Sequence, residues 1–254
     1  MFAVLTMLAA LVSISPPRVL AASDSQLATN GGDYVVVLHG LGRSKMAMWP
    51  LALRLRRAGY RAELISYSSL RDTRDEMLKD IARQVAACCL GKSGKVHFVG
   101  HSLGGVMVRA YLAKHDVPNL GRVVLLGTPN GGSGMIDHLK DAWWFGLLGP
   151  VARDLGTGAD SYPRSIGPPD YPVGIIAGKF PLIPNERMLP GDDDGLVSVA
   201  ETKIEGMSDF LVIETRHVGL RYSVEAARQV VRFLDTASFD HTPRVRAAGI
   251  RISR

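Results

Sequence analysis

The sequence predicts a single α/β domain in which a mainly parallel β-sheet is covered by helices on both faces. Segments with the composition of buried strands alternate with helical segments along most of the 254-residue chain, and such alternation is typical of βαβ units. The first strand candidate, residues 34–38, is the continuous apolar run YVVVL, as expected of a strand buried on both faces of its sheet. With 46% hydrophobic residues, the composition excludes disordered, collagen-like and disulfide-dense chains.

The other elements follow in order. Strands are expected at residues 60–67, 95–99, 122–126, 173–177 and 210–214. Helices are expected at residues 48–58, 73–90, 106–115 and 223–234. The helix at 73–90 carries its own boundary signals, because Thr73 and Glu76 form a capping-box pattern and Gly91 is a stop signal.

The segment 133–172 departs from this alternation, since it lies between two core strands without a strand of its own. Before a stretch rich in Gly and Pro it contains the large apolar residues Trp143, Trp144, Phe145, Leu147 and Leu148. A long insertion at such a place in a compact domain is usually functional.

The two ends of the chain differ in composition from the domain, which spans residues 34–239. Residues 1–22 contain an apolar run followed by two prolines and small residues, the order found in a secretory signal peptide. The run is short for a membrane span and no Lys or Arg precedes it, so a retained apolar anchor is the alternative. We expect an exported protein, periplasmic or secreted, with a linker at 23–33 and a basic tail at 240–254.

The formal net charge is +6, but the basic residues are not gathered in one region. Apart from Arg54, Arg56 and Arg57 and a group of arginines in the tail, they are spread along the chain. Nucleic-acid binding is therefore not expected.

Cys88 and Cys89 are adjacent in a predicted helix, where a bridge would strain the peptide between them. Two buried free thiols are therefore expected, with no structural disulfide. No His or Cys pair beside them has the spacing of a zinc site.

The pentapeptide Gly100-His101-Ser102-Leu103-Gly104 matches the pattern Gly-x-Ser-x-Gly. It lies between a predicted strand and a predicted helix, as a nucleophile elbow requires. The turn is tight, so Gly100 and Gly104 avoid a Cβ clash and leave the Ser102 hydroxyl exposed. Ser102 is therefore the candidate nucleophile.

A serine hydroxyl needs a base within hydrogen-bond reach, and the elbow arrangement has its acid and then its histidine later in the chain. His217 follows the predicted strand at 210–214, at the sheet edge where α/β sites assemble, and is the candidate base. His241 lies after the last helix in a polar tail and is expected to be a bystander. His97 lies inside a predicted strand and is expected in the core.

The acid that orients the histidine is expected in the run Asp192-Asp193-Asp194-Gly195. Three consecutive carboxylates usually form a solvated loop, but one of them can be the orienting group. We favour Asp194, next to Gly195, and keep Asp193 as the alternative. The run lacks the alternating ligands of a calcium loop, so no metal and no other cofactor is expected.

Backbone N–H groups are needed to stabilise a developing alkoxide. The first strand ends in the glycine turn His39–Gly42, whose amides can point at the reacting oxygen. We assign this role to the Leu41 amide and to the Leu103 amide, directly after the nucleophile. His39 and His101 flank these turns and are expected to shape them.

Together these motifs resemble those of α/β hydrolases, and more narrowly those of bacterial triacylglycerol lipase-like and PGAP1-like hydrolases. The resemblance covers roughly residues 35–239 and rests on the segments His39–Gly42, Gly100–Gly105, Gly127–Pro129 and Asp194–Val197 and on the strand end at His217. It implies a catalytic triad of Ser102, Asp194 and His217. It also implies a lid-like role for the insertion at 133–172, whose apolar and aromatic residues suit an acyl chain.

The function implied by the resemblance is hydrolysis of carboxylic esters, of lipid or medium-chain acyl groups, through an acyl-enzyme. Two alternatives stay open: an acyltransferase with the same triad, and a lipid-binding envelope module without catalysis. The apolar N-terminal segment and insertion also allow association with a membrane surface, and the oligomeric state is open. Arg216 precedes His217 where such hydrolases often have Ser, and the direction of its side chain decides whether it affects the base.

Overall fold

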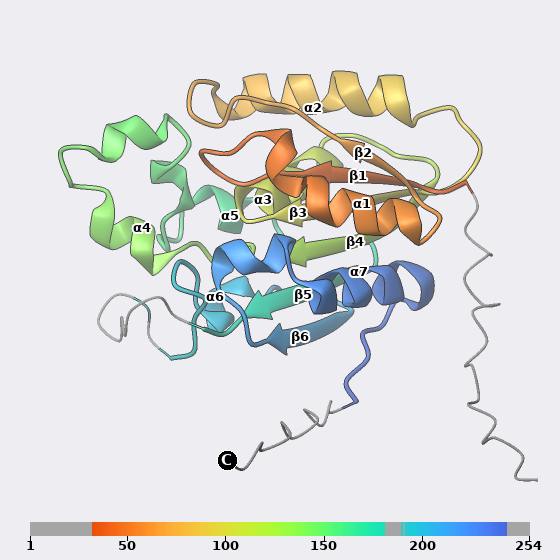
Figure 1. Cartoon of the computed structure of the whole chain (residues 1–254). Helices are drawn as coiled ribbons and strands as arrows, with labels where there is room; N and C mark the ends of the chain where they lie inside the picture. Colours follow the sequence, from red (N-terminus) through yellow and green to blue (C-terminus); the bar gives the residue numbers. More distant parts are fainter. Residues whose placement is uncertain (1–31, 181–188, 190, 243–254) are drawn as a thin grey trace, which may run out of the picture.

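The residues that the computed structural model describes are 32–180, 189 and 191–242 (Figure 1). The signal peptide or anchor expected at 1–22, most of the linker at 23–33 and most of the basic tail at 240–254 lie outside them. Within the described residues, no helix has both the length and the apolar character needed to cross a membrane.

The core is a six-stranded parallel sheet, as the sequence predicted. The strands are β1 (Tyr34–Leu38), β2 (Arg61–Leu64), β3 (Val96–His101), β4 (Leu120–Leu126), β5 (Val173–Gly178) and β6 (Asp209–Ile213). They lie in the order β2-β1-β3-β4-β5-β6, and every neighbouring pair is parallel. The chain reverses its direction across the sheet after β2, so the C-terminal ends of β1 and β3 are neighbours. Ligand sites of open α/β sheets assemble at such a switch point.

The longer helices cover both faces of the sheet. On one face lie α1 (Trp49–Arg57) and α7 (Val224–Thr236), and on the other α2 (Arg74–Cys88) and α3 (Leu103–Leu112) (Figure 1). Successive side chains of β1 pack alternately against these two helix layers, because neighbouring side chains of a strand point to opposite faces of the sheet. Val36 packs in the cluster with α2 and α3, and Val35 and Val37 pack in the cluster with α1 and α7. The apolar run at 34–38 is thus explained by burial on both faces.

The expectation of free thiols at Cys88 and Cys89 is wrong, since the structure joins them in a disulfide. The helix α2 begins with the predicted capping box of Thr73 and Glu76 but ends at Cys88. Cys89 has φ −134° and ψ −33°, outside the helical range. Free thiols were expected because a continuous helix was assumed through both cysteines. The chain instead leaves the helical conformation at Cys89.

The insertion at 133–172 forms short helices beside the C-terminal ends of the strands (Figure 1). They are α4 (Gly134–Leu139), the 3₁₀ helices η3 (Phe145–Leu148) and η4 (Arg153–Leu155), and α5 (Tyr162–Ser165). Buried Arg109 of α3 anchors the insertion, because its guanidinium donates to Asn130 Oδ1 at 3.0 Å and to the Gly167 carbonyl at 2.8 Å. Arg109 thus ties both the loop just before the insertion and the Gly167 region near its end to α3.

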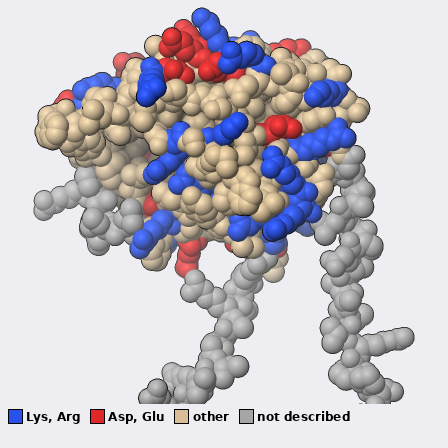
Figure 2. Space-filling view, turned by 45° about the horizontal axis from the view of Figure 1, so that its top comes forward, with Lys and Arg blue, Asp and Glu red and all other residues tan. Residues whose placement is uncertain are grey.

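The positive charge does not form one continuous surface on the face shown in Figure 2, where Lys and Arg side chains lie in several separate groups. The predicted basic group in the last turn of α1 is partly engaged. Arg54 donates to the Pro50 carbonyl at 3.1 Å, and Arg56 donates to the Ala62 carbonyl at 2.6 Å. Arg56 therefore ties α1 to β2, whereas Arg54 bonds within α1 itself. Positive charge also suits the C-terminus of a helix.

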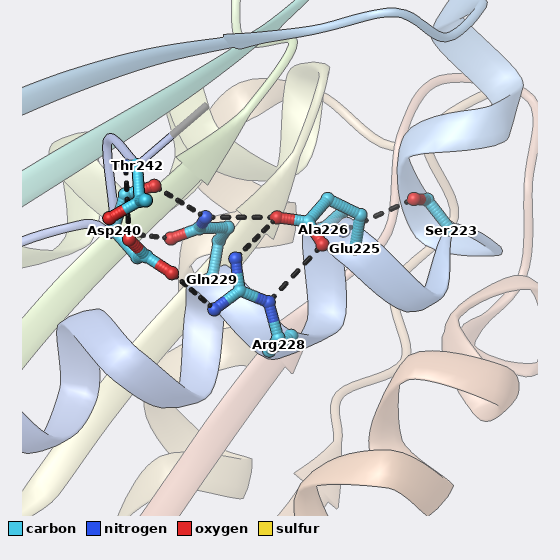
Figure 3. A network of polar contacts seen from close by, with 7 residues as sticks. All are labelled: Ser223, Glu225, Ala226, Arg228, Gln229, Asp240 and Thr242. Atoms are coloured by element: carbon cyan, nitrogen blue, oxygen red, sulfur yellow. Dashed lines mark hydrogen bonds and ion pairs between the residues drawn. The ribbon is translucent and has the colours of Figure 1, made fainter. Parts of the chain in front are cut away.

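A polar network ties the segment after α7 back onto that helix (Figure 3). Asp240 accepts a hydrogen bond from Arg228 Nη1 at 2.8 Å, and its amide donates to Gln229 Oε1 at 2.9 Å. Arg228 also binds Glu225, one turn earlier on α7. The network fixes the preceding Phe239, which packs into the core against Phe233 of α7 with ring centroids 5.0 Å apart.

The two phenylalanines make Gly174 of β5 intolerant of a side chain. A Cβ atom there would lie 2.6 Å from the Phe233 ring and 2.7 Å from the Phe239 ring. We expect Gly174→Ala to lower the free energy of unfolding by about 1–3 kcal/mol, the usual cost of overpacking. Gly146→Ala is the matched control, because a Cβ atom at Gly146 meets nothing within 4 Å. Equal denaturation midpoints for the Gly174→Ala and wild-type proteins would contradict this packing.

Candidate active site

Ser102 occupies a strained turn between β3 and α3. Its φ of 56° and ψ of −127° lie outside the regions that side-chain-bearing residues ordinarily adopt. The turn closes only because its neighbours are glycines: a Cβ at Gly100 would lie 2.4 Å from the Gly105 Cα, and one at Gly104 would lie 2.5 Å from the Leu38 carbonyl oxygen. The helix α3 begins directly after Ser102, three residues earlier than expected, because its first turn contains glycines that helix propensity disfavours.

His217 and Asp194 form a buried pair next to this turn. His217 begins the 3₁₀ helix η5 (His217–Arg221), and its Nδ1 lies 2.7 Å from Asp194 Oδ2. The His217 amide also donates to the Asp194 carbonyl at 2.9 Å. The second carboxylate oxygen accepts from the amides of Leu196 and Val197 at 3.0 and 2.9 Å. An ionised carboxylate only accepts, so Nδ1 carries the proton and Nε2 is left as the basic nitrogen.

The alternative acid, Asp193, does not contact the histidine. Its Oδ1 accepts from the Gly195 amide at 2.7 Å and closes the turn on which Asp194 lies. Burial raises the pKa of Asp193 above its ordinary value. Asp192 points to Lys179 instead, at 2.8 Å. Of the three carboxylates, the structure brings only Asp194 to His217.

Of the other histidines named in the sequence analysis, His241 and His97 lie apart from this pair. His241 is exposed and binds Asp209 at 2.9 Å. His97 is buried in β3, where its Nδ1 accepts from the Arg122 amide at 2.8 Å. His39 and His101 hold the turns around Ser102, as described below. Arg216 stands over the Phe180 ring at 5.3 Å.

A cavity of about 340 Å³ brings Ser102 and His217 together in one lining. The turn after β1 contributes Gly40 and Leu41 to the same lining. A Cβ atom at Gly40 would lie 3.0 Å from the Ser102 Cβ, so this turn is in direct contact with the candidate nucleophile. The volume is at the lower end of the range for small-molecule sites, about 300–1,000 Å³.

The insertion supplies the apolar wall of the cavity. Its lining side chains are Met135, Ile136, Leu139, Trp144, Leu148 and Leu155. The sequence analysis singled out Trp144 and Leu148 but missed α4, whose apolar residues at positions i, i+1 and i+4 were the available signal. Trp143 and Leu147 turn the other way and are 93% and 75% exposed.

The two amides assigned to oxyanion binding are placed at the same end of the sheet. Leu41 lines the cavity, and Leu103 is the first residue of α3, where a helix presents unsatisfied N–H groups and the positive end of its dipole. Within the described part of the chain, neither amide donates to another backbone group. Neither amide is therefore committed to a described backbone partner, which a donor to a reacting oxygen requires.

Two buried imidazoles support the turns on either side of Ser102. His101 donates from Nε2 to the His217 carbonyl at 2.9 Å, while its Nδ1 is buried without a partner among the described groups. His39 bonds through Nδ1 to the Gly40 carbonyl at 3.0 Å and stacks on Tyr67. Burial lowers the pKa of His39 and holds that of His101 well below its ordinary value. Both rings are therefore neutral near pH 7.

We expect the free energy of unfolding to fall as the pH is lowered from about 7.5 to about 5. His101 has a folded-state pKa below its ordinary value of 6.5, so below that pH the unfolded chain binds more protons than the folded one. His101→Gln keeps a donor for the His217 carbonyl but does not titrate, so its pH dependence should be shallower. Denaturant titrations across this pH range measure the difference. The same slope in both proteins would rule out a buried neutral His101.

Comparisons with known proteins agree with this fold. The palmitoyl protein thioesterase family matches residues 34–159, which include Ser102 but neither Asp194 nor His217. A comparison with curated protein sequences gives no match.

Three solved structures represent the structural relatives. The mature form of lipase BlEst2 from Bacillus licheniformis is 22% identical with a TM-score of 0.64, over 80% of this chain and 91% of that one. Phospholipase PlaB from Legionella pneumophila is 18% identical with a TM-score of 0.66, over 81% of this chain and 59% of that one. The metagenomic carboxyl esterase MGS0156 is 16% identical with a TM-score of 0.57, over 83% of this chain and 76% of that one. Together with the parallel sheet, these matches show that the chain has the α/β-hydrolase fold of these lipase and esterase structures, and that residues 34–159 are similar to the palmitoyl protein thioesterase family.

Proposed function

We propose that the protein hydrolyses carboxylic esters of lipid or medium-chain acyl groups through an acyl-enzyme on Ser102. The observation that carries the proposal is that the strained Ser102 turn and the His217–Asp194 pair share one apolar cavity. A nucleophile, a base and an orienting acid are the parts that serine ester hydrolysis requires.

In the first half of the reaction, the Ser102 oxygen attacks the ester carbonyl and His217 Nε2 takes the hydroxyl proton. Asp194 holds the ring and stabilises the imidazolium without accepting the proton itself. The amides of Leu41 and Leu103 bind the oxygen of the tetrahedral intermediate. Collapse of this intermediate expels the alcohol, which receives the proton from His217.

In the second half, a water molecule attacks the acyl-enzyme while His217 again acts as base. The acid product leaves and Ser102 regains its proton. The same steps apply to a thioester, the bond named in the matched family, with a thiol as the leaving group.

The apolar wall of the insertion supports an acyl chain as the part of the substrate that is bound. Met135 of α4 and Trp144 and Leu148 at the two ends of η3 line the cavity, and burying apolar surface there contributes about 25 cal/mol per Å². The names of the structural relatives, a lipase, a phospholipase and a carboxyl esterase, support the same substrate class.

Replacement of the nucleophile tests the proposal. We expect Ser102→Ala to lower kcat/KM for p-nitrophenyl esters by at least about 10³-fold. Ser93→Ala, at an exposed position before β3, is the control and should keep wild-type rates. A series from acetate to palmitate gives the preferred chain length. Undiminished turnover in Ser102→Ala would refute the mechanism, and transfer of the acyl group to an alcohol instead of water would refute hydrolysis.

The adjacent carboxylates give a second test. We expect Asp194→Asn to lower kcat by about 10³- to 10⁴-fold, because an amide in this position favours the wrong tautomer of His217. Asp193→Asn removes the same charge one residue away and keeps an acceptor for the Gly195 amide, so its kcat should fall by less than about tenfold. Similar losses in the two variants would show that Asp194 has no special role.

A further inference from the structure

Arg221 is a buried cation in the wall of the same cavity, and no described carboxylate forms an ion pair with it. It is the last residue of η5, one helical turn after His217, and is only 4% exposed. Its side chain lines the cavity together with Ser102 and His217. Two of its guanidinium nitrogens, Nε and Nη1, are buried and have no hydrogen-bond partner among the described groups.

The surroundings of Arg221 do not compensate its charge. Tyr222 forms a hydrogen bond with Arg221, and its ring lies 5.0 Å from the guanidinium carbon. The nitrogens Nε and Nη1 stay without a hydrogen-bond partner among the described groups. Exposed Arg43 lies on the same cavity and adds positive charge, and burial lowers the pKa of Arg221. No ion pair between described residues includes Arg221 or Arg43.

A buried guanidinium that lacks a carboxylate is costly to the folded protein. Such a group suits an anionic ligand, because its N–H donors form a fixed fork that matches the oxygens of a phosphate or carboxylate. The apolar wall of the cavity comes from the insertion, whereas Arg43 and Arg221 come from the turn after β1 and from η5. The cavity therefore offers apolar side chains for an acyl chain and two cationic side chains for the remainder of the ester.

We propose that Arg221, assisted by Arg43, binds a phosphate or carboxylate on the alcohol part of the substrate, so that the enzyme selects anionic acyl esters over neutral ones. The inference rests on the proposed function, since it names the substrate class of the same site. Arg221 is on this account a specificity-determining residue, and the acid–base chemistry stays with Ser102, Asp194 and His217.

Matched ester pairs test the selection. One pair is 4-carboxyphenyl and 4-carbamoylphenyl octanoate, and the other is 1-octanoyl-glycerol 3-phosphate and 1-octanoyl-glycerol. We expect the wild-type kcat/KM to favour the anionic member of at least one pair by about tenfold or more, mainly through KM. A preference in the first pair identifies a carboxylate and one in the second a phosphate. Equal rates within both pairs would overturn the inference while leaving ester hydrolysis itself established.

Variants assign the preference to Arg221. We expect Arg221→Gln to bring the anionic-to-neutral ratio close to one and Arg221→Lys to keep part of it. Arg216→Gln is the matched control, because Arg216 is exposed and five residues away but does not line the cavity. Loss of the preference in Arg216→Gln as well, or its persistence in Arg221→Gln, would contradict the assignment.

A binding measurement separates this inference from catalysis. Calorimetry with octyl phosphate on the folded Ser102→Ala protein needs no turnover, and its affinity should fall about tenfold or more when Arg221→Gln is added. An unchanged affinity would overturn the role of Arg221 even if ester hydrolysis is confirmed. If octyl phosphate binds through Arg221 but no ester is cleaved, the anion site stands and the proposed function fails. Circular dichroism and thermal unfolding establish that each variant is folded.

Discussion

The candidate active site depends on the close approach of backbone segments at the C-terminal edge of the sheet. Glycines at these contacts leave too little room for a Cβ atom. The turn after β1 touches Ser102 at Gly40, and Gly127, after β4, lies against both His217 Nδ1 and Asp194 Oδ2. Gly178, at the end of β5, meets the Cβ of Asp194. A backbone conformation like that of Ser102 costs about 1–3 kcal/mol. It persists because α3 is buried along all but its last residue and leaves the turn no freedom to relax.

The same close packing determines the electrostatics of the cavity. The carboxylate of Asp194 is held by two amides and by His217, so it is not available to another cation. His39 and His101 are kept neutral by burial. Among the described residues that line the cavity, Arg221 and Arg43 therefore carry the positive charge. Such a surface favours negative charge, both on the reacting oxygen and elsewhere on a ligand.

Local patterns were sufficient to predict the order of the elements and part of the site. The apolar run of β1 and the capping box of Thr73 and Glu76 act through neighbours in sequence, and both are present in the structure. The position of Ser102 between a strand and a helix could likewise be predicted, because the Gly-x-Ser-x-Gly pattern and the signals for the flanking strand and helix are adjacent in sequence.

Contacts between distant residues could not be predicted in this way. Asp193 and Asp194 are the same residue type at adjacent positions. Which of them orients the histidine depends on which carboxylate contacts His217 of η5, and η5 follows only after β6. That no described carboxylate pairs with Arg221 also cannot be read from the sequence, since it depends on every element around the cavity. The prediction of free thiols at Cys88 and Cys89 was wrong because α2 ends at Cys88, two residues earlier than the helical pattern indicated.

Covalent labelling of the nucleophile tests the central claim most directly. The folded protein would be treated with an alkyl phosphonate p-nitrophenyl ester, which reacts with activated serine hydroxyls, and digested with trypsin. The account predicts one adduct per chain, on the peptide from Val96 to Arg109 at Ser102, and a much slower reaction in Asp194→Asn. An adduct on a different peptide, or no adduct on the folded protein, would contradict a Ser102 nucleophile activated by His217 and Asp194.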